Sequence, residues 1–191
     1  MSRPFLFLLV GLIHLSGSQK QPNILFFLVD DMGVGDTSVP FLYENGKPKR
    51  IPTNDLYRTP NMEKLAKNGR LFTQAYSYSV CSPTRISLMT GQAAPRHGVT
   101  TWTHPKKSSV DTGRVQTKTI KSPGDWTIQG LDLSLPLLPR ILKKAGYKTL
   151  FAGKAHFGPD DTPAGNPLNL GFDINIAGYG GGGPGAYHGK H

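Results

Sequence analysis

Three apolar runs of the chain each lead into a cluster of polar residues, and this repeated arrangement constrains the fold more than any other feature. The runs and the clusters that follow them are 24–29 with Asp30–Asp31, 70–76 with 81–85, and 147–152 with 153–156. In an open parallel sheet, ligands bind beyond the carboxyl ends of the strands. The pattern therefore predicts one functional site, assembled at one edge of a sheet.

The order of the predicted elements favours an α/β fold. Residues 24–29 are continuously apolar, as in a parallel strand that is buried on both faces. We expect strands at 24–29, 70–76 and 147–152, and helices at 59–69, 83–90 and 134–145. Strands that alternate with helices predict a three-layer sandwich around a mostly parallel sheet.

The first eighteen residues have the features of an export signal. Arg3 supplies a positive charge, residues 5–15 are almost entirely apolar, and small residues precede Gln19. The apolar run is shorter than the ~20 residues that a membrane span needs, so we expect cleavage before Gln19 rather than a stable membrane anchor. The mature domain would then be 19–191, exported to the periplasm or the extracellular space.

The net charge of +10 indicates attraction to an anionic partner. No nucleic-acid-binding motif accompanies this charge, so nucleic acid is not expected as the partner. Five basic residues fall in the unpatterned segment 103–121, namely Lys106, Lys107, Arg114, Lys118 and Lys121. This segment is compatible with binding of a sulfated polysaccharide, and a solvated surface loop is the favoured alternative.

A glycine-rich stretch at 178–185 has two interpretations. It is a flexible loop, or its backbone N–H groups cradle an oxyanion. It lacks the Lys-Ser/Thr ending of a P-loop, which excludes nucleotide binding of that type. The chain stops soon after this stretch, at His191, so we expect it to be truncated.

The paired carboxylates Asp30 and Asp31 are candidate metal ligands. Neighbouring residues of a strand point to opposite faces, so both can reach one ion only where the strand ends and the backbone turns. The glycines at 33 and 35 favour such a turn. Oxygen donors of this kind favour Ca²⁺ or Mg²⁺. The alternative is that the two aspartates only cap the turn.

The single cysteine, Cys81, cannot belong to an intramolecular disulfide. It lies at a predicted helix start, four residues before Arg85, where an exposed reactive group is favoured electrostatically. Lys154 and His156 share a face of an extended segment, which suits oxyanion binding and proton transfer. The alternatives are a buried inert thiol, a surface ion pair at Arg85, a solvated lysine and a structural histidine.

These motifs together resemble the sulfatase family of the alkaline-phosphatase-like superfamily, over nearly the whole mature sequence. The matching segments are 22–25 leading into Asp30–Asp31, the signature Cys81-Ser82-Pro83-Thr84-Arg85 with Leu88-Met89-Thr90-Gly91, the segment 153–158, and Gly171-Phe172-Asp173. The family usually has tryptophan at the position of Ala155, which leaves Lys154 and His156 in register.

The resemblance implies a sulfuric ester hydrolase in which a maturation enzyme oxidises Cys81 to formylglycine. The hydrated formylglycine would attack sulfur and later expel sulfate. Arg85 would hold the hydrate, Lys154 would neutralise a sulfate oxygen, and His156 would orient the hydrate or assist proton transfer.

The resemblance further implies a divalent cation, Ca²⁺ or otherwise Mg²⁺, bound by Asp30, Asp31 and residue 81. The family draws an Asp-Asn pair of ligands and another His and Lys from further along the chain, and no segment after Gly158 matches that set. We therefore expect residues 19–191 to be the N-terminal part of a sulfatase catalytic domain that acts on a sulfated small molecule or polysaccharide. The alternatives are a phosphonate or phosphodiester hydrolase of the same superfamily and an inactive, anion-binding fragment.

Overall fold

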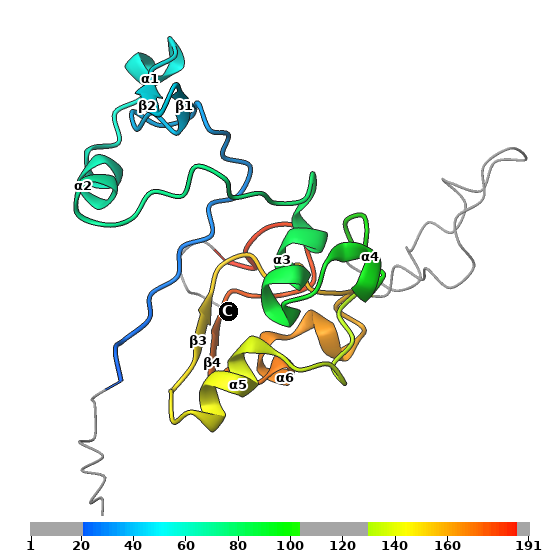
Figure 1. Ribbon diagram of the computed structural model, residues 1–191. Coiled ribbons are helices and arrows are strands. Elements are labelled where there is room, and N and C mark those ends of the chain that lie inside the picture. Colours follow the sequence, from blue (N-terminus) through cyan, green and yellow to red (C-terminus); the bar gives the residue numbers. More distant parts are fainter. Residues whose placement is uncertain (1–20, 104–129, 187–191) are drawn as a thin grey trace, which may run out of the picture.

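The computed structural model describes residues 21–103 and 130–186 of the chain (Figure 1). The predicted export signal and nearly all of the basic segment 103–121 lie outside these residues. In Figure 1, one group of helices lies beside a small sheet, and an N-terminal group of short elements extends away from it.

The N-terminal group contains a hairpin and two helices. Its elements are β1 (Leu42–Glu44), β2 (Lys47–Lys49), α1 (Thr53–Leu56) and α2 (Pro60–Asn68). The two strands are antiparallel, and the turn between them places Asn45 at φ 52° and Gly46 at φ 75°. A tight two-residue turn needs this backbone, and Asn-Gly is its strongest sequence signal. This hairpin was not predicted from the sequence.

The second group carries the residues of chemical interest. Its elements are α3 (Cys81–Thr90), α4 (Ala94–His97), α5 (Leu138–Lys144), β3 (Leu150–Ala152), the 3₁₀ helix η2 (Pro163–Gly165), α6 (Pro167–Leu170) and β4 (Ile174–Ile176). Strands β3 and β4 pair in parallel, with Leu150 opposite Ile174. Helix α3 ends where Gly91 adopts a left-handed backbone with φ 66°.

Each predicted helix is present, with different bounds. Helix α2 confirms the helix at 59–69, and α3 confirms the helix at 83–90 but begins two residues earlier. Helix α5 is shorter than 134–145 because Pro136 restricts the residue before it to extended backbone. The helix therefore begins at Leu138, with Pro139 in its first turn, where no N–H partner is needed.

Two predicted strands are wrong, and a third is shortened. Residues 24–29 and 70–76 form no strand, and Leu25 and Tyr76 are 80% and 87% exposed. An apolar run becomes a buried strand only where neighbouring strands and covering helices are present, and the described residues supply neither to these segments. The strand expected at 147–152 is reduced to β3, Leu150–Ala152.

The sheets of the described residues are small. One is the antiparallel pair β1–β2 and the other is the parallel pair β3–β4. The parallel pair agrees with the expected α/β class. The three-layer sandwich around a mostly parallel sheet is not confirmed by this structure and stays a prediction.

The core cluster of the described residues lies between α3, α5, α6 and the segment that follows β3. It consists of Ile86, Met89, Val99, Leu131, Leu137, Ala155, Phe157, Ala164 and Leu170. The ring of Phe157 packs edge-on against that of Phe151, with centroids 5.5 Å apart. Ala155 and Phe157 are both buried in this cluster, so the core fixes the backbone on either side of His156.

In the part of the chain that the structure describes, no helix is both long and apolar enough to cross a bilayer.

Candidate active site

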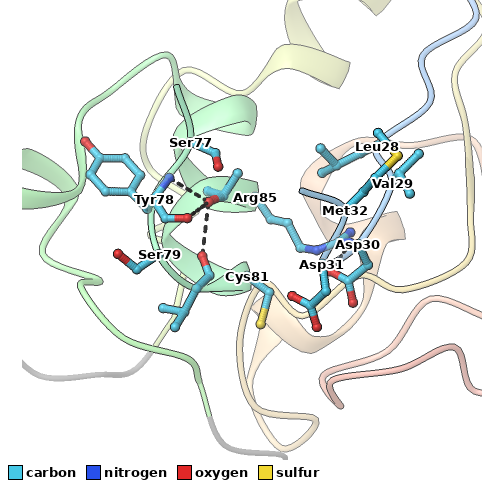
Figure 2. A pocket seen from close by; sticks show the side chains of 12 residues that line it. Leu28, Val29, Asp30, Asp31, Met32, Ser77, Tyr78, Ser79, Cys81 and Arg85 are labelled. Atoms are coloured by element: carbon cyan, nitrogen blue, oxygen red, sulfur yellow. Dashed lines mark hydrogen bonds and ion pairs between the residues drawn. The ribbon is translucent and has the colours of Figure 1, made fainter. Parts of the chain in front are cut away.

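A cleft lies between the N-terminus of α3 and the end of the apolar segment 24–29 (Figure 2). It is lined by residues 28–32, residues 77–81 and the first turn of α3, and its volume is about 220 Å³. Pockets that enclose a whole small molecule usually measure about 300–1,000 Å³. The cleft is therefore large enough for one charged group of a ligand rather than for an entire substrate.

The segment before α3 is fixed by Thr84, from the first turn of the helix. The Thr84 hydroxyl accepts a hydrogen bond from the N–H of Tyr78 at 3.0 Å and lies 3.0 Å from the carbonyl oxygen of Val80. These contacts set the point at which the chain enters the helix, and Cys81 is the first helical residue. The partial positive charge of a helix N-terminus is thereby placed beside the Cys81 side chain.

Asp30 forms ion pairs with both cations that the sequence analysis selected. Its two carboxylate oxygens lie 3.1 Å from an Arg85 guanidinium nitrogen and 2.6 Å from Lys154 Nζ. Arg85 is buried and also donates to the Lys154 carbonyl oxygen at 2.6 Å. Arg85 therefore joins α3, the end of segment 24–29 and the segment after β3.

The ionisation of Asp30 follows from these contacts. Burial raises the pKa of its carboxyl group, but hydrogen bonds from Lys154 and Arg85, together with their positive charges, outweigh burial. The net result is a lowered pKa, so Asp30 is ionised at neutral pH.

Both ring nitrogens of His156 have contacts, and its backbone adopts a left-handed conformation. Its Nδ1 lies 3.1 Å from Cys81 Sγ, its Nε2 lies 2.8 Å from the Thr103 carbonyl oxygen, and its backbone has φ 54°. Burial lowers the pKa of the imidazole, the positive charges of Lys154 and Arg85 lower it further, and the contact with Thr103 only partly offsets them. His156 is therefore neutral at neutral pH.

The glycine-rich segment supports the backbone of His156. The carbonyl oxygen of Tyr179 accepts from the His156 N–H at 3.2 Å, and the N–H of Gly180 donates to Asp160 at 2.6 Å. A Cβ atom on Gly182 would meet the His156 ring at 3.5 Å. These contacts show a segment packed against residues 156–160, which neither of our two interpretations of the glycines anticipated.

Replacing Gly180 with alanine is expected to displace this segment and to lower the melting temperature. The added Cβ would lie 2.4 Å from the Gly158 carbonyl oxygen and 2.7 Å from the Asp160 nitrogen, and backbone atoms cannot move aside cheaply. The expected cost is about 1–3 kcal/mol, as in other overpacked sites. Gly183→Ala is the matched control because a Cβ there meets nothing within 4 Å. Thermal unfolding of both variants tests this, and equal melting temperatures would contradict the close approach.

The candidate metal ligands are carboxylate oxygens, which suit a hard cation, but they are too few to complete its coordination shell. Both oxygens of Asp30 are engaged by cations, and Asp31, with φ 54°, lines the same cleft. In Figure 2 the two carboxylates lie close together on the side of the cleft that faces Cys81. Within residues 21–103 and 130–186, no group of three or more His, Cys, Asp or Glu side chains is suited to hold a metal. Ca²⁺ takes about 6–8 oxygen ligands, so these donors form only part of a shell.

Comparison with known proteins agrees with the motifs on which the site rests. The family model described as Sulfatase matches residues 22–182. The chain belongs to the sulfatase family. The human N-acetylgalactosamine-6-sulfatase is 36% identical over 159 residues, which cover 83% of this chain and 26% of that protein. The human steryl-sulfatase is 34% identical over 159 residues, which cover 83% of this chain and 23% of that protein.

Among solved structures, that of Ps i-CgsB is 24% identical and covers 78% of this chain and 26% of that one, with a TM-score of 0.45. The chain spans about a quarter of the length of the curated sulfatases that it matches. Activity, substrate and partners of the whole protein are therefore matters of proposal.

The structure brings together the residues that the sulfatase signature singled out. Cys81 lies beside His156, and Arg85 and Lys154 both bind Asp30. Asp31 lines the same cleft. Asn166, which lies after Gly158, has a structural role: its side chain caps α6 by accepting from the Leu168 N–H at 3.0 Å.

Three contributors to the site were missed from the sequence. Thr84 could have been found, since a hydroxyl in the first turn of a helix commonly bonds to nearby backbone groups. Ser82 stands inside the signature, and its buried hydroxyl accepts from the Thr103 N–H at 3.0 Å, but nothing in the sequence shows this contact. The carbonyl oxygen of Thr103 leaves no sequence signal because every residue carries one.

Proposed function

We propose that this sulfatase-family protein hydrolyses sulfate esters, with formylglycine formed from Cys81 and with a divalent cation, Ca²⁺ or otherwise Mg²⁺. The observation that carries the proposal is the position of Cys81, at the first residue of α3 and 3.1 Å from a buried, neutral His156. Cys81 has no disulfide partner within residues 1–191, and conversion to an aldehyde would give its side chain a chemical function.

The side chains around residue 81 can supply the polar functions that such a reaction needs. His156 presents Nδ1 to residue 81 and can accept a proton there. Lys154 carries the positive charge that would neutralise a sulfate oxygen, and Asp30 fixes its position at 2.6 Å. Arg85, buried between Asp30 and the Lys154 carbonyl, holds these groups in register.

The proposed reaction also needs two groups that the unmodified chain does not supply, hydrated formylglycine and a divalent cation. Hydrated formylglycine supplies a hydroxyl that can act as a nucleophile, and the cation supplies positive charge that stabilises developing negative charge. Asp30, Asp31 and residue 81 would hold the cation. Because these donors fill only part of a shell, we infer that further ligands come from outside the described residues. Residues 19–191 would then be the N-terminal part of a catalytic domain.

The expected partners follow from this chemistry. A formylglycine maturation enzyme must act on Cys81, and the substrate is a sulfated small molecule or polysaccharide. The two human relatives carry the names of different sulfatases, so their likeness supports sulfate esters as a class and no particular one. We place the mature protein in the periplasm or the extracellular space, after cleavage before Gln19.

Side-by-side assays of an aryl sulfate, an aryl phosphonate and an aryl phosphodiester test the proposed activity. With the protein at its full natural length and residue 81 matured, we expect the sulfate to have the highest kcat/KM. Removal of the divalent cation by a chelator should lower this activity, and added Ca²⁺ should restore it. A preference for either phosphorus ester would favour the alternative hydrolase, and no turnover of any ester would favour an anion-binding protein.

A further inference from the structure

We infer that Ser82 and Thr103 are positioning residues that hold His156 in one tautomer, with its hydrogen on Nε2 and the lone pair of Nδ1 directed at residue 81. The inference deepens the proposed function and relies on it for the role of His156. The tautomer itself can be measured without any activity.

The first link is between Ser82 and the backbone of Thr103. The Ser82 hydroxyl oxygen accepts from the Thr103 N–H at 3.0 Å and lies 3.3 Å from the Thr103 hydroxyl. Ser82 is fully buried and Thr103 is 1% exposed. Water therefore cannot replace this contact, and leaving a buried N–H without a partner would cost about 1–3 kcal/mol.

The second link is between Thr103 and His156. The carbonyl oxygen of Thr103 lies 2.8 Å from His156 Nε2. A carbonyl oxygen can only accept a hydrogen bond, so Nε2 must carry the hydrogen. In a neutral imidazole the other nitrogen then has none, and Nδ1 is an acceptor.

The third link returns to the helix. His156 Nδ1 lies 3.1 Å from the side chain of Cys81, which directly precedes Ser82 in α3. Two consecutive residues of one helix thus control the two nitrogens of the ring. Cys81 faces the reactive nitrogen, and Ser82, through Thr103, fixes the other.

The direction of proton transfer depends on this arrangement. With the lone pair on Nδ1, His156 takes up a proton from the group at residue 81: the bond of that proton to residue 81 breaks, its electrons stay there, and an N–H bond forms at Nδ1. The opposite tautomer would point an N–H at residue 81 and leave Nε2 facing a carbonyl oxygen with no hydrogen between them. That tautomer can donate at residue 81 but cannot accept.

Histidine-selective ¹⁵N NMR of the protein at its full natural length tests the tautomer directly. The chemical shifts of the two ring nitrogens distinguish a protonated from an unprotonated atom, and a His156→Gln spectrum assigns the signals. We expect neutral His156 to carry its hydrogen on Nε2, both in the parent protein and in Cys81→Ala. A hydrogen on Nδ1 in the parent, or a change of tautomer in Cys81→Ala, would overturn the inference.

Three variants distinguish an effect on the tautomer of His156 from a general loss of stability. Ser82→Ala should yield a mixture of the two tautomers and lower kcat about 10- to 100-fold, with a smaller change in KM. Thr103→Val keeps the backbone carbonyl and should leave the tautomer unchanged. Ser87→Ala is the same substitution further along α3, where the hydroxyl contacts His97 at 2.9 Å, and it should leave His156 unaffected.

The outcomes distinguish this inference from the proposed function. An Nε2–H tautomer in a protein that cleaves no sulfate ester would contradict the function and leave the positioning intact. A sulfatase with the Nδ1–H tautomer, or with the parental tautomer and kcat retained in Ser82→Ala, would contradict the positioning alone.

Discussion

Replacing Cys81 with serine is expected to lower the turnover number for a sulfate ester by at least about 10³-fold. Serine keeps a hydroxyl group at the N-terminus of α3, beside His156. As an unoxidised alcohol, serine lacks the second hydroxyl that the release of sulfate requires. Steady-state assays of parent and variant, each at full natural length, measure the effect.

The fold should tolerate this change. Cys81 is only partly buried and lies outside the core cluster, so Cys81→Ser should melt close to the parent protein. Cys81→Ala is the matched control and should be equally inactive, which would exclude any contribution from the serine hydroxyl. Turnover by Cys81→Ser within about tenfold of the parent would contradict the proposed role of residue 81.

Replacing Arg85 with methionine is expected to lower both activity and stability. Methionine fills much of the space of the arginine stem but leaves Asp30 with one cation instead of two and the Lys154 carbonyl without its donor. We expect the free energy of unfolding to fall by about 1–3 kcal/mol, the cost of leaving buried polar groups unsatisfied. Turnover should fall about 10²–10³-fold, as when one charge-stabilising donor is removed from an active site.

Two controls accompany the Arg85 variant. Arg85→Lys keeps the charge but not the forked guanidinium, so it should retain only one of the two contacts and show an intermediate loss. Arg96→Met makes the same chemical change on an exposed residue of α4 and should alter stability by about 0.5 kcal/mol or less. Denaturant unfolding and aryl sulfate assays give both quantities. Equal effects of Arg85→Met and Arg96→Met would show that Arg85 does not organise the site.

Local signals in the sequence predicted α2, α3 and α5, because caps and breakers lie within these helices or directly beside them. Pro60 and Gly69 bound α2, and Gly91 ends α3. Strands depend on partners distant in the chain. Some predicted strands are therefore absent, and some strands that are present were not predicted. The apolar run at 24–29 forms no strand, whereas the polar residues Lys47–Lys49 do form one because Asn45-Gly46 folds them back on β1.

The side chains of the candidate site were predicted from the sequence, and their mutual geometry was not. Spacing alone placed Lys154 and His156 on one face, but it did not show that Lys154 binds Asp30 while His156 approaches Cys81. The left-handed backbone of His156 lets the two side chains reach different groups. The His156 N–H in this conformation donates to the carbonyl oxygen of Tyr179. Contacts of this kind use backbone atoms, which carry no residue-specific signal.

Peptide mapping of residue 81 by mass spectrometry tests the central claim most directly. Cleavage after Arg70 and Arg85 releases the peptide 71–85, which contains the only cysteine of the chain. In protein produced together with a formylglycine maturation enzyme, we predict that this peptide has lost its sulfur, carries an aldehyde that reacts with hydrazides, and resists thiol alkylation. A peptide that is uniformly alkylated as an unmodified thiol, in protein that nevertheless hydrolyses an aryl sulfate, would contradict the account.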